Sequence, residues 1–403
     1  MSSHEVVIAG AGPVGMVAAL RLGQAGVPVT VLEAGDDLAL DSKASTFHIP
    51  SLELLDTLGI GDTMHEQGLR APVFQQRERH GGVLAELDLG VLSDVTRFPY
   101  RLQLEQNKLT RIIRPILESM DHVELRFGVR ADRAEDRGDR AALFVDGSDE
   151  PLETDWLLGC DGANSMVRQS LGFGFEGVTF PERFLVMSTS HEFRDSIPDL
   201  AHVAYINDPD EWVVLLRTPD HWRVLMPVPA EESDEAAVSD ARIQARLHGL
   251  VRLDHDVEVL QHSLYRVHQR VASTFSQRRV LLAGDSAHMN NPLGGMGMNS
   301  GIHDAWSAVD TILAVRDGAD ADKASHIFGQ VRAETCHEYV QAMTTSNFRD
   351  MQEKDREARE ARNTMIRGLV DDPAAARTYL LTTSMLTSAR ESIARVQREL
   401  ASL

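Results

Sequence analysis

The stretch EVVIAGAGPVGMVAALRLGQAGVPVTVLE, residues 5–33, decides the fold. Residues 5–9 form a short apolar run typical of a strand, and residues 16–24 have a helical pattern that Gly26 ends. Residues 27–33 predict a second strand. Between the first strand and the helix lies GAGPVG, residues 10–15, so the stretch is one strand–helix–strand unit of an α/β fold.

The three glycines of this unit have separate tasks. Gly10 permits the tight turn, Gly12 lets the backbone approach a pyrophosphate, and Gly15 lets helix and strand pack closely. The helix N-terminus then points unpaired amides at the phosphates. Glu33 ends the second strand, where a carboxylate can accept hydrogen bonds from a ribose diol. The unit predicts dinucleotide binding rather than an empty glycine turn, but it does not choose between FAD and NAD.

Two further motifs follow in the chain. LLGCDGANSMVRQSLG, residues 157–172, is a buried strand, a turn at Asp161, and a helix that begins near Arg168; alone, such a turn is usually only a turn. LLAGDSAHMNNPLGGMGMNSG, residues 281–301, places Asp285 after a buried strand and then a glycine-rich loop. A buried carboxylate needs partners, and a chain of sugar hydroxyls would supply them. The loop fits either a flat, partly anionic ligand or a mobile segment.

Between residues 184 and 228 the pattern changes to four strands separated by short polar turns, which predicts an antiparallel sheet. From about residue 304 the pattern is mostly helical. The charge run MQEKDREAREAR, residues 351–362, indicates a solvated helix face rather than a binding site. We therefore expect a Rossmann-like α/β domain interleaved with an antiparallel-sheet domain, plus a helical C-terminal tail. The expected boundaries are 1–70, 97–180 and 265–330 for the first, 71–96 and 181–264 for the second, and 331–403 for the tail.

Composition excludes several classes of partner. The 403-residue chain has a formal net charge of −21, which disfavours nucleic acid and anionic membrane surfaces, although a local basic pocket could still bind a small anion. The two cysteines form no CxxC pair and no disulfide framework, and the N-terminus has no signal-peptide pattern. We expect a cytoplasmic monomer or homodimer that binds no metal and does not enter a membrane.

The order of the three motifs resembles that of the flavoprotein aromatic hydroxylases of the para-hydroxybenzoate hydroxylase type, the class A flavoprotein monooxygenases. The resemblance covers the first domain well, including KASTFHIPSLELLDTLGI, residues 43–60, and is weak over the sheet and the tail. It implies FAD as cofactor, NADH or NADPH as reductant, and O₂. A flavin hydroperoxide would then hydroxylate a small aromatic or N-heteroaromatic ring, phenol-like or hydroxypyridine-like.

The resemblance also assigns residues. In such a protein Ala34 replaces an arginine near the adenine, Lys43 keeps the charge of a second arginine without its fork, and Gln106 is preferred to Gln103. The helix that begins near Asn299 would direct its amides at the reduced flavin ring. The implied FAD contacts are Gly10, Gly12, Pro13, Val14, Gly15, Glu33, Ala34, Lys43, Gln103, Gln106, Asp161, Arg168, Asp285, Pro292, Gly295, Gly297, Met298 and Asn299.

Residues on the substrate side follow from the same resemblance. Pro292 would border the reacting ring, Arg223 matches an arginine near the flavin, and His48 lies near the implied flavin contacts, so these three are the catalytic candidates. The substrate candidates on the four strands are Tyr205, Arg217, Trp222 and Met226, and each is as compatible with core or surface packing.

Other functions remain open from the sequence. They are a hydroxylase of a polyketide or quinone precursor and a non-hydroxylating flavoprotein, such as a halogenase relative or a redox-silent FAD scaffold. The chain carries no WxWxIP stretch of the halogenases and no thioredoxin-like extension, which favours a small ring as substrate. The lack of a cysteine pair argues against the disulfide reductases.

Overall fold

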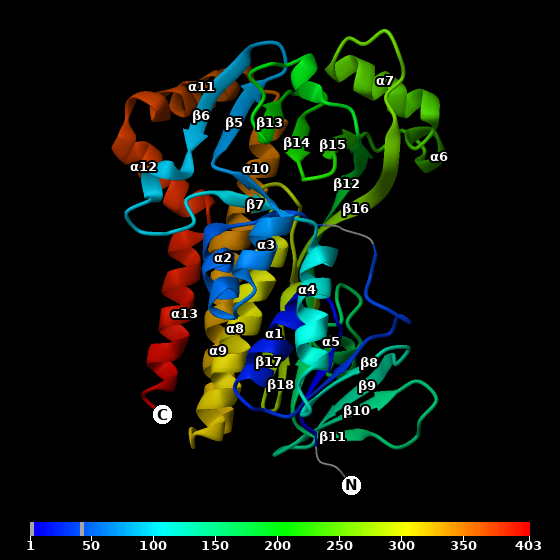
Figure 1. Cartoon of the computed structure of the whole chain (residues 1–403), viewed down its shortest axis with the longest axis vertical. Coiled ribbons are helices and arrows are strands. Elements are labelled where there is room, and N and C mark those ends of the chain that lie inside the picture. Colours follow the sequence, from blue (N-terminus) through cyan, green and yellow to red (C-terminus); the bar gives the residue numbers. More distant parts are fainter. Residues whose placement is uncertain (1–3, 41–43) are drawn as a thin grey trace.

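The structure, a computed structural model, describes residues 4–40 and 44–403. The chain forms two parts, one built on a mostly parallel sheet and the other on an antiparallel sheet. The long helices α8 (Gly297–Arg316), α9 (Ala321–Thr335) and α13 (Leu386–Leu400) run beside the first part (Figure 1). A small sheet of β3 (Thr46–Phe47), β7 (Arg101–Gln103) and β4 (Leu69–Ala71) lies where the two parts meet. The predicted fold class is confirmed.

The first sheet contains five parallel strands in the order β18-β11-β1-β2-β8, with β17 antiparallel at one edge and β10–β9 continuing antiparallel from β11. Neighbours in the sheet are far apart in the chain, because β1 pairs with both β2 and β11. The strands are β1 (His4–Ala9), β2 (Val29–Leu32), β8 (Val123–Arg126), β9 (Ala131–Asp136), β10 (Ala141–Val145), β11 (Leu152–Gly159), β17 (Ser276–Gln277) and β18 (Val280–Leu282).

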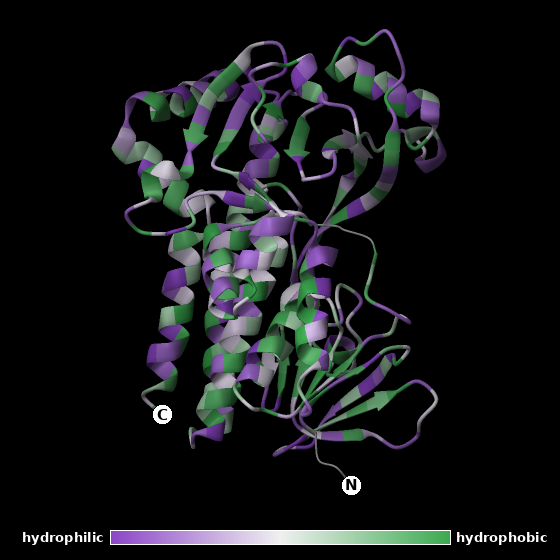
Figure 2. Ribbon diagram, in the orientation of Figure 1, coloured by the Kyte–Doolittle hydropathy of each residue, from purple (hydrophilic) through white to green (hydrophobic). Residues whose placement is uncertain are grey.

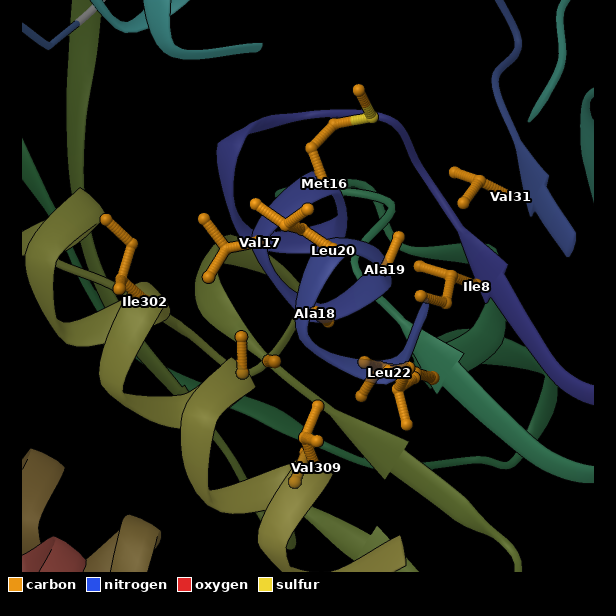
Figure 3. Close-up of a cluster of buried hydrophobic side chains, with 14 of the residues drawn as sticks. Ile8, Met16, Val17, Ala18, Ala19, Leu20, Leu22, Val31, Ile302 and Val309 are labelled. Carbon is orange, nitrogen blue, oxygen red and sulfur yellow. The ribbon is translucent and has the colours of Figure 1, made fainter. Parts of the chain in front are cut away.

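Helix α1 (Pro13–Gln24) fills the core beside this sheet. Its side chains lie among those of the flanking strands and of α8 (Gly297–Arg316), and Figure 3 shows Val17 facing Ile302 in this cluster. The helix begins three residues before the predicted start, because proline is well suited to the first helical position. This packing fixes the glycine turn that precedes the helix.

The second sheet has the order β19-β16-β12-β15-β14-β13-β5-β6. All its pairings are antiparallel except that of β13 with β5. The four strands predicted between residues 184 and 228 are confirmed. Its strands are β5 (Val73–Glu78), β6 (Gly82–Asp88), β12 (Phe175–Thr189), β13 (Val203–Asn207), β14 (Val213–Arg217), β15 (Trp222–Val228), β16 (Val259–Ala272) and β19 (His288–Met289). Because β12 and β16 extend past residues 181 and 264, the sheet continues beyond the boundaries expected for the second domain.

Helices cover both parts. Surface helices such as α7 and α13 alternate hydrophobic and hydrophilic residues, whereas the inner strands of the first sheet are mostly hydrophobic (Figure 2). No described helix is both long and apolar enough for a membrane span. The remaining helices are α2 (Ile49–Thr57), α3 (Gly61–Gln67), α4 (Gln106–Glu118), α5 (Met166–Ser170), α6 (Asp234–Ala237), α7 (Asp240–Leu250), α9 (Ala321–Thr335), α10 (Ala342–Met351), α11 (Arg356–Asp371), α12 (Pro373–Thr383) and α13 (Leu386–Leu400).

Candidate active site

A cavity of about 580 Å³ lies between the two parts and takes its walls from both. One wall comes from the turn before α1 and from the loops after β11 and β18. The opposite wall is the inner face of the antiparallel sheet. Lining residues include Gly12, Pro13, Val14, Gln106, Asp285, Pro292, Gly295, Gly297 and Met298 on the first wall, and Val186, Tyr205, Val214, Leu216, Arg223, Leu225 and Tyr265 on the second. The cavity therefore has one side lined by glycines and another side lined mostly by apolar residues.

Of the three glycines in the turn before α1, Gly12 has open space beside it, and the other two are packed against the protein backbone. A Cβ on Gly10, whose φ is +104°, would lie 2.4 Å from the carbonyl oxygen of Cys160, and one on Gly15 would lie 2.0 Å from that of Gly10. Gly10 and Gly15 are therefore required by close packing of the protein itself. A Cβ on Gly12 would meet no atom within 4 Å, and Gly12 lines the cavity at the N-terminus of α1. This open, amide-bearing position fits a pyrophosphate.

Glu33 follows β2 and is fixed by the backbone around it. Its Oε2 accepts a 2.9 Å hydrogen bond from the Ala11 amide, and its Oε1 accepts one of 2.9 Å from the Gly35 amide. A carboxylate has about four acceptor positions, so both oxygens keep capacity for ribose hydroxyls. Ala34 is exposed beside it, and Lys43 lies outside the described residues.

Asp161 and Arg168 brace the turn after β11. Asp161 Oδ2 accepts a 3.1 Å hydrogen bond from the Val167 amide, while its buried Oδ1 has no hydrogen-bond partner among the described residues, and burial raises the pKa of this carboxyl. The Arg168 guanidinium donates to the carbonyl oxygen of Ser286 at 3.0 Å and lies 3.8 Å from the ring of Phe175. Arg168 does not line the cavity. Its side chain ties this turn to the Asp285 turn, so the structure does not support Arg168 as a direct cofactor contact.

Asp285 lies in the turn Gly284–Ser286 after β18 and lines the cavity. The expectation of a buried carboxylate here is wrong, because the side chain is exposed. The strand before it is buried, but the chain turns outward at Gly284, whose φ is +68°. Asp285 is thus available from the cavity side to sugar hydroxyls.

A buried ionic cluster holds this turn from behind. Asp304 Oδ2 accepts hydrogen bonds from the Gly284 amide at 3.0 Å and from His288 Nε2 at 2.7 Å, and Asp304 Oδ1 accepts one from Arg332 Nε at 2.7 Å. Burial alone would raise the pKa of Asp304, but Arg332 and His288 outweigh burial and hold it well below its usual value. Asp304 is therefore a buried carboxylate that fixes the backbone next to Asp285.

Residues 292–298 form the glycine-rich loop of the opposite end of the cavity. Gly294 and Gly295 have φ of +101° and +68°, which only glycine adopts at little cost. Asn299 clamps the loop: its Nδ2 donates to the carbonyl oxygens of Thr46 at 2.9 Å and of Gly295 at 2.7 Å. Pro292, Gly295, Gly297 and Met298 line the cavity, whereas Asn299 is buried behind it. Asn299 positions the loop rather than facing a ligand.

His48, expected as a catalytic candidate, also lies behind this loop. Its Nε2–H donates to the Gly294 carbonyl oxygen at 2.7 Å, and its backbone amide donates to Asn299 Oδ1 at 2.9 Å. Burial, together with the nearby charge of Arg101, lowers the pKa of His48 to about 3. The ring is not among the cavity-lining side chains, so the structure does not support His48 as a catalytic group.

The two glutamines expected as FAD contacts, Gln103 and Gln106, differ in whether they reach the cavity. Gln106 begins α4 and lines the cavity, in agreement with the preference drawn from the sequence. Gln103 lies in β7, is fully buried, and its Oε1 accepts a 3.0 Å hydrogen bond from Thr46 Oγ1. Gln103 is part of the small sheet and does not reach the cavity.

On the substrate side, strand alternation divides the expected residues. Arg223 and Leu225 of β15 face the cavity, so Trp222 and Met226 face the other side of the sheet. There they pack in a hydrophobic cluster with Ile243 of α7. The structure therefore does not support Trp222 and Met226 as substrate contacts, because each is one position out of phase with the cavity face.

Arg217 of β14 lies on the face of the sheet that points away from the cavity, for the same reason. Val214 and Leu216 line the cavity, while Arg217 turns away and donates a 2.6 Å hydrogen bond to the carbonyl oxygen of Thr218. The structure does not place Arg217 in the substrate pocket. Tyr205 of β13 does line it, as expected.

Arg223, Tyr205 and Tyr265 are the polar residues on the sheet face of the cavity. Arg223 is buried and its Nη1 donates a 3.1 Å hydrogen bond to Ser45 Oγ. Burial lowers the pKa of Arg223, although Tyr265 opposes this, and burial raises the pKa of Tyr265. The sequence does not predict Tyr265, because β16 mixes exposed, half-buried and buried residues and gives no pattern that marks one residue as a cavity contact.

These features suit a flavin nucleotide, and comparison with known proteins agrees. The chain belongs to the family described as FAD binding domain, which matches residues 3–344. Two similar proteins are para-nitrophenol 4-monooxygenase of Pseudomonas sp. (strain WBC-3), 32% identical with 96% of each chain covered, and 6-hydroxy-3-succinoylpyridine 3-monooxygenase HspB of Pseudomonas putida (strain DSM 28022 / S16), 32% identical with 86% of this chain and 89% of the relative covered.

The crystal structure of p-nitrophenol 4-monooxygenase PnpA from Pseudomonas putida DLL-E4 matches this fold with a TM-score of 0.90. The two chains are 30% identical, and the match covers 96% of this chain and 99% of that one. The protein is an FAD-dependent monooxygenase of the aromatic hydroxylase class, so the expected cofactor, enzyme class and reaction are confirmed.

The residues present fit FAD. The open position at Gly12, the carboxylates of Glu33 and Asp285, and the amide-rich loop of residues 292–298 are acceptors and donors of the kinds that the dinucleotide needs. When bound, the flavin supplies the reaction with O₂ after reduction by NADH or NADPH. The chain's own tasks are to hold the dinucleotide, to orient the aromatic ring against the apolar sheet face and to exclude water. The described residues contain no group of three or more metal-binding side chains.

Proposed function

We propose that this chain hydroxylates a phenol or hydroxypyridine whose ring hydroxyl lies near Arg223 and Tyr265. The observation that carries the proposal is the Arg223 cation beside Tyr265, in a sheet wall that is apolar apart from these two residues and Tyr205. A cation at that place stabilises a phenolate, which is the electron-rich form of the ring. The two similar monooxygenases are named for a nitrophenol and for a hydroxypyridine, which supports this substrate class.

For the cofactor we propose contacts by part of the cavity wall. Gly12, Pro13 and Val14 would hold the pyrophosphate, Glu33 the ribose, and Asp285 the sugar-alcohol chain that joins the phosphates to the flavin. Gln106 and residues 292–298 would contact the flavin side. Support comes from the cavity-lining position of most of these residues and from the hydrogen bond that joins Glu33 to the Ala11 amide of the glycine turn. A cytoplasmic location and a monomeric or homodimeric state complete the proposal, consistent with the free thiols of Cys160 and Cys336.

The experiment is substrate-stimulated oxidation of NADH and NADPH by the FAD-loaded enzyme. The panel pairs each hydroxylated ring with the same ring lacking the hydroxyl: 4-nitrophenol with nitrobenzene, and 2-hydroxypyridine with pyridine. We expect stimulation only with hydroxylated rings, together with a product in which one atom from ¹⁸O₂ is detected by mass spectrometry. Equal rates with both members of every pair would contradict the proposed role of the ring hydroxyl.

A further inference from the structure

A second, smaller chamber adjoins the reaction cavity. It has a volume of about 190 Å³ and shares the wall residues Tyr205, Gly294 and Met296 with the main cavity. Its other walls come from β5, β7 and β13 on one side and from α10, α11 and α12 on the other, so the C-terminal helices close it. In Figure 1, α10, α11 and α12 lie beside the strands β5, β6 and β13 at the end of the molecule away from the first sheet. Apart from the three shared residues, the lining of this chamber takes no part in the reaction cavity.

The chamber is lined by an arginine with a buried, incompletely satisfied charge. Arg101 is 3% exposed, and its guanidinium lies 4.1 Å from the ring of Phe74. Its Nη1 donates a 3.1 Å hydrogen bond to the Tyr205 hydroxyl, but its buried Nε has no hydrogen-bond partner. Among the described residues, the side-chain partners of Arg101 are the Tyr205 hydroxyl and the Phe74 and Tyr205 rings, and none of them is a carboxylate. A buried cation without a counter-ion is costly, and an anion in the chamber would remove that cost.

The other charged groups of the chamber leave it net cationic. Arg362 of α11 also lines it, together with Met365 and Ile366. The charge run that contains Arg362 was expected to be a solvated helix face, but the side chain of Arg362 reaches Asn207 of β13. Its Nη1 donates to Asn207 Oδ1 at 3.0 Å and its Nη2 to Asn363 Oδ1 at 2.6 Å, so Arg362 is already satisfied by neutral groups. The one carboxylate in the lining is Asp350. In a chain of net charge −21, such a cationic chamber is a local reversal of the overall field.

We propose that this chamber binds a planar group with two oxygen atoms, a carboxylate or a nitro group, and that Arg101 is its main donor. A guanidinium matches such a group with a fork of two parallel hydrogen bonds. The group can arrive in two ways. It is either a substituent of the aromatic substrate, which extends past Tyr205 while the ring stays in the main cavity, or a free small anion. The first source rests on the proposed function, and the second does not.

The test uses the FAD-loaded enzyme and three probes: 3-(4-hydroxyphenyl)propanoate, its uncharged amide, and propanoate alone. Dissociation constants are measured by calorimetry, and FAD content is measured for every variant. Arg101→Gln is expected to weaken binding of the acid about tenfold or more, with less than a twofold change for the amide. Arg356→Gln is the matched control, because that arginine lies on α11 with its side chain 81% exposed, and no change is expected.

A second variant keeps the test decisive if Arg101→Gln loses its fold. Asp350→Asn removes the opposing carboxylate of the chamber and is expected to tighten binding of the acid about threefold, a gain that general destabilisation does not produce. Two results together would overturn the proposal. In the wild type the acid and the amide would bind equally well, and propanoate would bind with the same affinity to the wild type and to the Arg101 and Asp350 variants.

The remaining outcomes separate the two sources. If propanoate alone binds in an Arg101-dependent manner while the acid binds no better than the amide, the chamber takes a free anion. If propanoate binds in an Arg101-dependent manner while neither phenol binds, the chamber site stands without the part of the proposal that rests on the proposed function, and the ring-hydroxyl panel decides that function separately. If both phenols bind equally and propanoate does not bind, the proposed function stands and the chamber site fails.

Discussion

His48 and Gly294, 246 residues apart in the chain, are joined by a 2.7 Å hydrogen bond from the imidazole Nε2 to the backbone carbonyl oxygen. A carbonyl only accepts, so the proton must be on Nε2 and the neutral ring is the form that this contact orients. The bond fixes the wall between the reaction cavity and the second chamber, because Gly294 lines both.

This neutral, buried imidazole makes stability depend on pH. The pKa of His48 is lowered to about 3 in the folded chain, against an ordinary value of about 6.5. Between these two values the unfolded state binds a proton at this ring and the folded state does not. The free energy of unfolding should therefore fall as pH decreases from 6.5 to 5, by up to about 1.4 kcal/mol per pH unit for this group. His303, with its pKa also lowered to about 3 by burial, adds to the slope.

Urea unfolding of the enzyme between pH 7.5 and 5 measures this dependence. His48→Gln should be less stable at pH 7.5, because a buried contact changes, but should show a shallower loss of stability toward pH 5. The carboxylates titrate mostly below this window. A His48→Gln slope equal to that of the wild type would mean that the histidine is not held neutral in the fold.

Glu33→Ala should weaken FAD binding by about 1–3 kcal/mol, because it removes the acceptor proposed for the ribose and the two hydrogen bonds from the Ala11 and Gly35 amides. Titration of apoprotein by quenching of flavin fluorescence measures the dissociation constant. Asp36→Ala is the control, since Asp36 is exposed in the same loop. Equal effects of the two variants would assign the loss to loop charge instead of the ribose contact.

Asp285→Ala should also weaken FAD binding, by about 1–3 kcal/mol, since a cavity-facing acceptor for hydroxyl groups is lost. Because Asp285 is exposed in the ligand-free chain, the substitution should leave the urea midpoint of the apoprotein nearly unchanged. The two measurements together separate a ligand contact from a structural carboxylate. An unchanged FAD dissociation constant would remove Asp285 from the proposed site.

Arg223→Lys should slow substrate-stimulated flavin reduction while FAD stays bound, because lysine keeps the charge but not the planar fork that reaches Ser45 Oγ and the cavity. Stopped-flow absorbance with and without substrate gives the rate. Arg217→Lys is a close control, since Arg217 lies on the neighbouring strand and turns away from the cavity. The role assigned to Arg223 fails if both variants reduce at the wild-type rate.

The part of the fold that the sequence predicts well is local. The first strand–helix–strand unit is contained in residues 5–33, where turn glycines, apolar periodicity and the terminal acid all lie within one supersecondary element. The order of the three motifs then predicts FAD through its resemblance to the flavoprotein aromatic hydroxylases, and the structure places residues of all three motifs in one cavity.

The sequence does not predict which side chains of a strand point into the cavity, for a physical reason. β15 is buried on both faces, so Trp222, Arg223 and Met226 all lie in one buried run, with no polar alternation to mark the cavity face. The roles of His48 and Asn299 depend on partners about 250 residues away, and no local pattern encodes such contacts. Burial of Asp285 was inferred from the strand before it, but the turn at Gly284 reverses its exposure.

The Asp304 cluster has a consequence for the far end of the chain. Arg332, which holds Asp304, also donates a 2.8 Å hydrogen bond through Nη1 to Ser392 Oγ of α13, so one network joins the C-terminal helix to the amide of Gly284 beside Asp285. Coupling of this kind is reciprocal: the effect of FAD binding on the stability of α13 and the effect of α13 docking on FAD affinity have the same coupling free energy. Loading with FAD should thus protect the backbone amides of α13 from hydrogen exchange. Faster exchange in that helix would then indicate protein without bound FAD, although α13 does not line the cavity.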